Sequence, residues 1–316
     1  MIDNINYKTH PQYQTAEIDR NQSETLKGDI IIPNSIKYCG SNFEVTKIHE
    51  DAFRDSQINS ITFDPESKIT VIPFESFQFS TIKKITLSPQ ITIIKGGAFS
   101  SCRRLKEIEI PPNSELKQID YHALYDTQIE SLLIPSKLTK FSPNWNSSIQ
   151  KLSKITVMPG NLSYIDVDHH QYLLGKSCPE KKVFDVLIMA SRLIKSANIP
   201  DTIEIIEKNA FEYCKKLEKF ILPPNVKRIN SSAFSFCKSL KKFIVPSNSK
   251  LQFFEEEILR SCPIKSLVIP QHVLFFSNRA LLYLYELKII FIEENTELYH
   301  IDALIFCGLS DVILLV

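Results

Sequence analysis

The chain has 316 residues, of which only 7 are glycine, and its 37 basic and 36 acidic residues leave a net charge of +1. It contains neither G-x-G-x-x-G nor G-x-x-x-x-G-K-[ST], the glycine-rich patterns of phosphate-binding loops, which argues against a nucleotide-binding enzyme. The balanced charge argues against a nucleic-acid-binding protein, because such proteins are usually basic.

The N-terminal segment, residues 1–25, is expected to form a lead or cap before the first regular element. Its first 22 residues are polar and lack the apolar core of a secretory signal peptide. The longest apolar runs, such as 289–292 and 312–316, are far shorter than the roughly 20 residues of a membrane-spanning helix. We therefore expect no membrane span.

From residue 26 onward the chain repeats itself. The pattern apolar-x-x-apolar-x-apolar, often followed by proline, recurs about every 23 residues, with clear copies starting at Leu105, Leu217, Leu240 and Ile264. Its last apolar position predicts twelve strands. The first strand is an early copy of the pattern at residues 26–33. The other eleven end at Phe63, Leu87, Ile110, Ile134, Val157, Ile199, Leu222, Val245, Ile269, Ile292 and Leu314.

A second pattern, Ile-x-x-x-Ala-Phe, runs in phase with the first, as in Ile94 to Phe99 and Ile206 to Phe211. Each repeat is thus predicted to be a strand, a turn and a return segment whose Ile and Phe point inward. A single repeat of this kind cannot bury its apolar side chains, so neighbours are expected to stack into one continuous core. The return segments are too short for full helices, which favours irregular or 3₁₀ turns.

One long interval separates Val157 from Ile199. Its apolar stretches, 164–167, 172–174 and 183–190, predict a small β-hairpin insertion at about residues 160–190. The expected domain organisation is a single solenoid over residues 26–316, interrupted by this insertion.

The composite motif L-x-x-L-x-L-P-x-x-[VL]-x-x-I-x-x-x-A-F-x-x-C is clearest in residues 217–238. It resembles the leucine-rich repeat of the BspA-like surface-antigen family, and recognisable copies cover about residues 26–315. The resemblance implies an α/β-type solenoid, with a parallel β-sheet on the concave face and short irregular or 3₁₀ segments on the convex face. It also implies a surface protein that adheres to host matrix, cells or other microbes.

Five cysteines occupy one repeat position, just before the next strand: Cys102, Cys214, Cys237, Cys262 and Cys307. A small, weakly hydrogen-bonding side chain suits a buried turn, so we expect free thiols in the core. A metal or redox site would need short spacings such as C-x-x-C, which are absent. His49 and the pair His169-His170 are interpreted as solvated turn residues, and no catalytic residue, cofactor or metal is predicted.

The outward positions of the strands change character along the chain. At the fifth position of the motif the first half carries mainly polar residues, such as Thr62, Thr86 and Thr156. The second half is apolar there, and we predict that it binds a protein. The predicted contact residues are Ile221, Ile244, Val268, Phe291 and Ile313 at the fifth position, Ile289 at the third, and the flanking lysines Lys219 and Lys242.

The resulting functional hypothesis is a non-catalytic adhesion module with a protein or glycoprotein ligand on the concave face. An intracellular scaffold for protein–protein interaction is the alternative, and an enzyme confined to the insertion would depend on His169 and His170. An open strand edge beside an apolar column also predicts self-association. Nucleic acid is not expected as a partner, because aromatic residues are not interleaved with the lysines.

Overall fold

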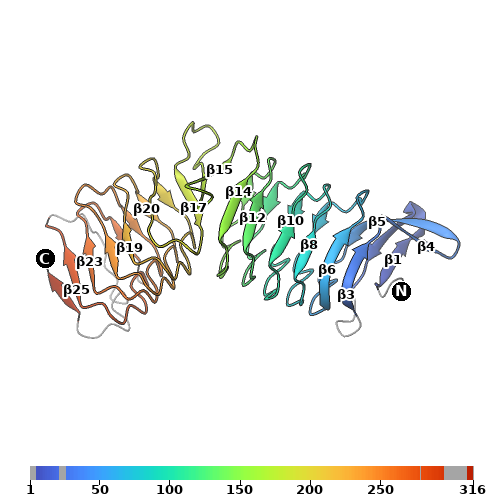
Figure 1. The fold of residues 1–316 in the computed structure, drawn as a ribbon, viewed down its shortest axis with the longest axis horizontal. Helices are drawn as coiled ribbons and strands as arrows, with labels where there is room; N and C mark the ends of the chain where they lie inside the picture. Colours follow the sequence, from blue (N-terminus) through green and yellow to red (C-terminus); the bar gives the residue numbers. More distant parts are fainter. Residues whose placement is uncertain (1–4, 21–25, 278, 295–311, 316) are drawn as a thin grey trace. The chain divides into compact units, whose positions relative to one another are not determined.

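The computed structural model describes residues 5–20, 26–277, 279–294 and 312–315. The chain forms two compact units: residues 1–152 with 156–162, and residues 153–155 with 163–316. The chain passes from the first unit to the second around β14 (Lys154–Val157). Each unit is a parallel β-solenoid, and Figure 1 shows the strands of successive repeats lying side by side within each.

The first unit begins with a mixed four-stranded sheet in the order β1-β2-β5-β4. Its β1 and β2 pair antiparallel, β2 and β5 pair parallel, and β4 and β5 form an antiparallel hairpin. Its elements are β1 (Tyr7–His10), the 3₁₀ segment η1 (Pro11–Tyr13), β2 (Thr15–Ile18), β4 (Ser35–Tyr38) and β5 (Ser41–Ile48). Ile5, Ala16 and Ile18 are buried, so this segment is packed against the repeats that follow.

Two ladders of parallel strands follow in the same unit. The front ladder contains the strands of the apolar-x-x-apolar-x-apolar motif, and the return ladder contains two-residue strands of the return segments. The front ladder consists of β3 (Lys27–Ile32), β6 (Gln57–Phe63), β8 (Lys84–Thr86) and β10 (Glu107–Glu109), followed along the chain by β12 (Ser131–Ile134). The return ladder consists of β7 (Val71–Ile72), β9 (Ile93–Ile94), β11 (Gln118–Ile119) and β13 (Lys140–Phe141).

The second unit is built in the same way. Its front ladder consists of β19 (Lys219–Ile221) paired with β21 (Lys242–Ile244), and of β23 (Ser266–Ile269), β25 (Ile289–Ile292) and β26 (Ile313–Leu315). Its return ladder consists of β18 (Ile205–Ile206), β20 (Arg228–Ile229), β22 (Phe253–Phe254) and β24 (Phe275–Phe276). All pairs within these ladders are parallel.

An antiparallel hairpin precedes the return ladder of the second unit. It is formed by β15 (Tyr164–Val167) and β16 (Tyr172–Gly175), and β16 pairs antiparallel with β17 (Val186–Ala190). Since β17 in turn pairs parallel with β18, the hairpin extends the ladder into one seven-stranded sheet. Tyr172, Leu173 and Leu174 are buried, so this segment belongs to the core.

The α/β label is not confirmed, because the described residues contain no α-helix and η1 is their one 3₁₀ segment. The return segments consist of turns and two-residue strands. In the described repeat turns a non-glycine residue also has its backbone in the left-handed region, for example Ser101 at φ 58° and Tyr213 at φ 59°, a conformation that interrupts a right-handed helix.

The Ala-Phe positions form the interior of both units. Phe53, Phe77 and Phe99 are fully buried, and their rings stack with centroids 4.8 and 5.1 Å apart. In the second unit Phe211 and Phe234 stack at 4.7 Å. This spacing matches the distance between neighbouring strands, so the ladder geometry itself brings the rings into contact.

Candidate functional site

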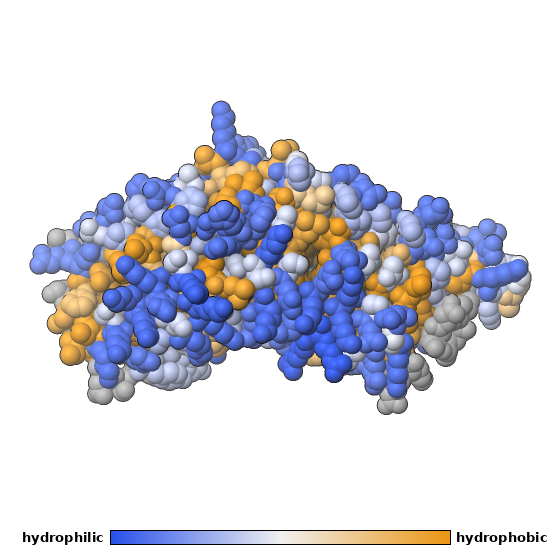
Figure 2. All heavy atoms as spheres, viewed as in Figure 1, coloured by the Kyte–Doolittle hydropathy of each residue, from blue (hydrophilic) through white to orange (hydrophobic). Residues whose placement is uncertain are grey.

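The outward side of the front ladder in the second unit is apolar. Ile221, Ile244 and Phe291 are 52%, 36% and 40% exposed, while Val268 and Ile289 are half-buried. Ile221 lies directly beside Ile244, and Val268 directly beside Phe291. In Figure 2 apolar surface gathers over the part of this unit where Figure 1 draws β25.

The position predicted for Ile313 is wrong by two residues. Its partner on β25 is Ile289, and the residue beside Phe291 is Leu315, which is 43% exposed. Ile313 still lies on the outward side, at 57% exposed, because side chains alternate along a strand and a shift of two keeps the face. The apolar column, defined as Ile221, Ile244, Val268, Phe291 and Leu315, therefore has a second row beside it, Ile289 and Ile313.

Lysines flank the apolar column. Lys219 and Lys242 are both exposed and lie directly opposite each other on β19 and β21. Within the described ranges neither has a carboxylate within salt-bridge distance. This part of the surface therefore combines apolar side chains with positive charge that no salt bridge among the described residues neutralises.

The corresponding surface of the first unit satisfies its own polar groups. Lys84 Nζ lies 2.5 Å from Glu109 Oε1 and 3.5 Å from Glu107 Oε2. The Thr86 hydroxyl donates to Glu109 at 2.6 Å, and the Ser60 hydroxyl donates to Asp29 at 2.7 Å. The hydrogen bond from Lys84, together with that from Thr86, lowers the pKa of Glu109.

The cysteine ladder is buried, as predicted, at the four positions that the structure describes. Cys102, Cys214, Cys237 and Cys262 have 0–2% exposure, and Cys307 lies outside the described residues. The Cys237 thiol donates to the carbonyl of Phe211 at 3.1 Å, and the Cys262 thiol to that of Phe234 at 3.1 Å. Burial raises the pKa of Cys102 to about 12 and raises the pKa of Cys214 and of Cys237 well above the ordinary value, so these three thiols are poor nucleophiles.

In the part of the chain that the structure describes, no group of three or more His, Cys, Asp or Glu side chains is placed to hold a metal ion. His169 and His170 lie in the turn between β15 and β16, with φ of 54° and 66°. The His170 ring contacts the Asp166 carboxylate, and the His49 ring contacts the backbone carbonyl of Glu50.

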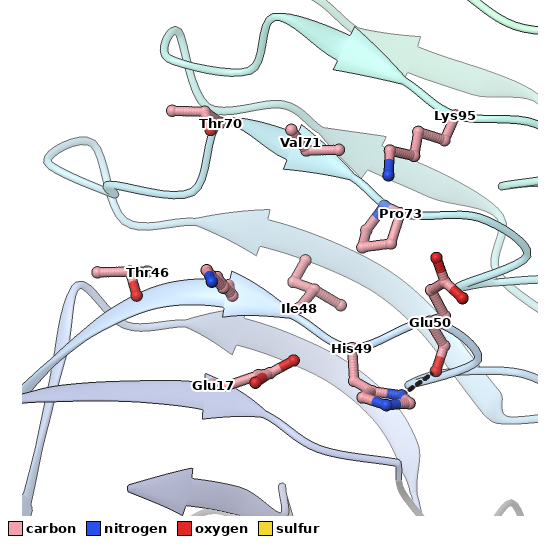
Figure 3. A pocket seen from close by; sticks show the side chains of 10 residues that line it. Glu17, Thr46, Ile48, His49, Glu50, Thr70, Val71, Pro73 and Lys95 are labelled. Atoms are coloured by element: carbon pink, nitrogen blue, oxygen red, sulfur yellow. Dashed lines mark hydrogen bonds between the residues drawn. The ribbon is translucent and has the colours of Figure 1, made fainter. Parts of the chain in front are cut away.

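A pocket of about 430 Å³ lies between β5 and β7 of the first unit (Figure 3). Elsewhere in the return ladder the residue that follows each two-residue strand donates its backbone N–H to the preceding strand. Lys95, which follows β9, donates in this way to the Ile72 carbonyl at 2.9 Å. The equivalent residue after β7 is Pro73, which has no N–H, and β5 and β7 are not hydrogen-bonded neighbours. Sequence reasoning missed this pocket, although the proline was its signal.

A family model described as "BspA type Leucine rich repeat region" matches residues 30–153 and 204–314, in six copies. The chain belongs to this family. No curated protein matches the chain.

Solved structures support the same fold. The chain is similar to the pneumococcal vaccine antigen PcpA, with 21% identity over 93% of this chain and 81% of that one, at a TM-score of 0.77. It is also similar to a leucine-rich cell surface protein from Faecalibacterium prausnitzii, with 20% identity over 100% and 93% of the two chains and a TM-score of 0.71. A leucine-rich repeat protein from Bacteroides ovatus follows, with 20% identity over 94% and 66% and a TM-score of 0.57.

These comparisons name no enzyme, and members of a repeat family of this kind serve as binding scaffolds. Among the described residues no helix has the length and apolar character to cross a membrane. The leucine-rich repeat framework therefore suits the binding of another protein.

Proposed function

We propose that this protein is a non-catalytic adhesion module. The outward side of the front ladder in the second unit is the concave face on which it binds a protein partner. The observation that supports this proposal is the apolar column, together with the lysines that flank it. Exposed apolar side chains on consecutive strands lose little conformational entropy on binding, because the ladder already fixes their spacing. A structured, regularly spaced surface of this kind favours recognition of a macromolecule.

The partner that fits this surface presents apolar side chains bordered by carboxylates. Phe291 is the one aromatic member of the apolar column, so it is the expected anchor of the contact. Lys219 and Lys242 would attract the acidic groups of the partner and speed its association. The names of the similar structures, a vaccine antigen and a cell surface protein, support a role at a cell surface.

The test replaces three residues of the apolar column with threonine, which keeps strand propensity while removing apolar contact. The variant Ile244→Thr/Val268→Thr/Phe291→Thr should retain at most about a tenth of the host-matrix protein bound by the parent chain in a pull-down. The control is Ile31→Thr, because Ile31 is 71% exposed at the same outward position of the first unit, beside Thr62.

A folded triple variant that binds as strongly as the parent would contradict the proposal. Binding to cytosolic extract but not to matrix extract would instead favour the intracellular scaffold. Self-association is separated from both by sedimentation of the purified chain, since dimerisation through the apolar column would be lost in the triple variant.

A further inference from the structure

The turns of the second unit carry a column of aromatic side chains. Tyr213, Phe236, Ser261 and Tyr283 occupy equivalent positions in consecutive repeats, each with φ between 58° and 62°. The Tyr213 N–H donates to the Ser235 carbonyl at 2.9 Å, which fixes the spacing of these two neighbouring turns. As a result the rings of Tyr213 and Phe236 stack, with centroids 4.8 Å apart and planes 10° from parallel.

The column is interrupted where Ser261 replaces an aromatic residue. The same repeat is one residue shorter after its cysteine, since Cys262 is followed by Pro263 and Ile264 where the preceding repeat has Lys238, Ser239 and Leu240 after Cys237. Small side chains and a shortened turn leave a pocket of about 210 Å³ at this point. It is lined by Lys238 of the preceding repeat, by Ser261, Cys262 and Pro263, and by Tyr283, Tyr285 and Glu286 of the following repeat.

Two tyrosine rings wall this pocket. Tyr283 is 38% and Tyr285 is 72% exposed, and their centroids are 5.9 Å apart with planes inclined at 48°. The guanidinium of Arg260 lies 4.9 Å from the Tyr283 centroid and 5.3 Å from that of Phe236. Glu257 also holds Arg260 at 2.8 Å, so Tyr283 packs against a guanidinium that is itself anchored.

The polar groups of the pocket are of both signs. Lys238 Nζ lies 5.7 Å from the Phe236 centroid, and in the described ranges neither Lys238 nor Glu286 has a salt-bridge partner. An ammonium donor, a hydroxyl on Ser261 and a carboxylate acceptor can each bond to hydroxyl groups of a ligand. A phosphate or carboxylate ligand would be repelled by Glu286, so this set favours a neutral, hydroxyl-rich molecule.

We propose that this pocket binds one neutral hexopyranose unit of a glycan. The C–H face of the sugar packs against Tyr285 and Tyr283, where the apolar contact and the ring quadrupole both favour it. Glu286 accepts hydrogen bonds from two neighbouring hydroxyls, while Lys238 and Ser261 donate to others. The pocket volume is below the 300–1,000 Å³ usual for drug-sized ligands, which matches a single sugar ring. This site shares no residue with the apolar column.

Saturation-transfer NMR of the full chain tests the proposal, with the methyl glycosides of glucose, galactose, mannose and N-acetylglucosamine as probes. Irradiation of the aromatic protons should saturate the ring C–H protons of at least one of these glycosides. Tyr285→Ala should weaken that binding at least about fivefold, whereas Tyr285→Phe, which keeps the ring, should stay within about twofold. Glu286→Gln should weaken it as well, since a charged acceptor is lost.

The matched control is Tyr13→Ala, because Tyr13 is also 72% exposed but lies in η1 of the first unit. The proposal would be overturned if none of the four glycosides were saturated, or if the Tyr285→Ala variant bound them as strongly as the parent chain. N-Acetylneuraminic acid and AMP are included as competitors, and a stronger signal from either would overturn the neutral-sugar assignment. Binding that survives in the triple threonine variant separates this site from the proposed protein-binding surface.

Discussion

The front ladders of the two units share one backbone design, but their outward surfaces differ in chemistry. In the first unit Lys84 and Thr86 of β8 both donate hydrogen bonds to Glu109 of the neighbouring β10. In the second unit the positions equivalent to Thr86 and Glu109 belong to the apolar column, and the position of Lys84 is taken by Lys219 and Lys242, which lie directly opposite each other. The inward positions are occupied alike in both, by aliphatic residues and stacked phenylalanines.

The contrast shows that one repeat framework keeps its core-forming positions constant while its exposed positions vary. Alternation along a strand sends the first, fourth and sixth motif positions into the core, so these are constrained by packing in every repeat. The third and fifth positions point outward and are free to vary. The outward surface of the first unit neutralises its own charges, whereas that of the second unit leaves lysines beside exposed isoleucines, and the proposed protein contact rests on this arrangement.

The largest expected effect concerns the shared interior. Phe234→Ala removes a fully buried ring that stacks on Phe211, and Phe77→Ala removes one between Phe53 and Phe99. Each should cost about 3–5 kcal/mol of stability, and the damage should be greatest in adjacent repeats, because a solenoid is held by nearest-neighbour interfaces. Hydrogen exchange measures this. If Phe234→Ala left exchange unchanged around residues 211–260, the two interiors would not be equivalent.

The buried thiols should behave alike in both units. Cys102 lies in the first unit and Cys214, Cys237 and Cys262 lie in the second, whereas Cys39 is exposed. We expect the four buried thiols to react with a thiol reagent at least about a hundredfold more slowly than Cys39, and all of them to react rapidly in denaturant. The measurement is mass spectrometry of partly labelled native protein. Fast labelling of one unit alone would show that its core opens separately.

The period and the interior were accessible from sequence, because repeated apolar spacing reports directly on burial. Leu217, Phe220 and Leu222 are all buried, as the motif requires, and so are Ala210 and Phe211. The cysteine position was predictable for the same reason. A small side chain recurring before each strand indicates a buried turn.

Three features depended on information that side-chain patterns do not carry. A two-residue shift leaves every side chain on its own face, so the pattern could not distinguish Ile313 from Leu315 as the neighbour of Phe291. The two-residue strands of the return ladder are defined by backbone pairing alone. The pocket beside Ser261 arises from one missing residue in one repeat, which is visible only when neighbouring repeats are placed together.

The lysines of the second unit should be slightly unfavourable for folding. Lys219 and Lys242 are directly opposite on adjacent strands, and like charges in that arrangement repel. Replacing Lys219 by threonine should therefore raise the thermal midpoint by a small amount, and the gain should vanish at high salt. The matched change Lys84→Thr should lower the midpoint, because Lys84 is bonded to Glu109. A fall in both variants would mean that the lysines stabilise both ladders alike.

The smallest effect on stability is expected for a substitution of Glu109, which tests the ion pair of the first unit alone. Hydrogen bonds from Lys84 and Thr86 hold the pKa of Glu109 below the ordinary value of 4.5. A lowered pKa means that the ionised carboxylate favours the folded state, so its contribution is present above pH 4.5 and disappears as the pH falls through the lower, folded-state value. Glu109→Gln should thus have a lower thermal midpoint than the parent at pH 7.

The difference should shrink as the pH falls below 4.5 and through the lower folded-state pKa of Glu109, because the parent carboxylate then also becomes uncharged. Added salt should reduce the difference at pH 7, because the pair is partly exposed. Glu218→Gln is the control, since Glu218 is an exposed carboxylate at the edge of β19 with no salt bridge among the described residues. Its midpoint should follow that of the parent at every pH. The two variants could instead show the same pH dependence. The polar groups of the first unit would then be no better paired with one another than those of the second, and the contrast that supports the binding proposal would be lost.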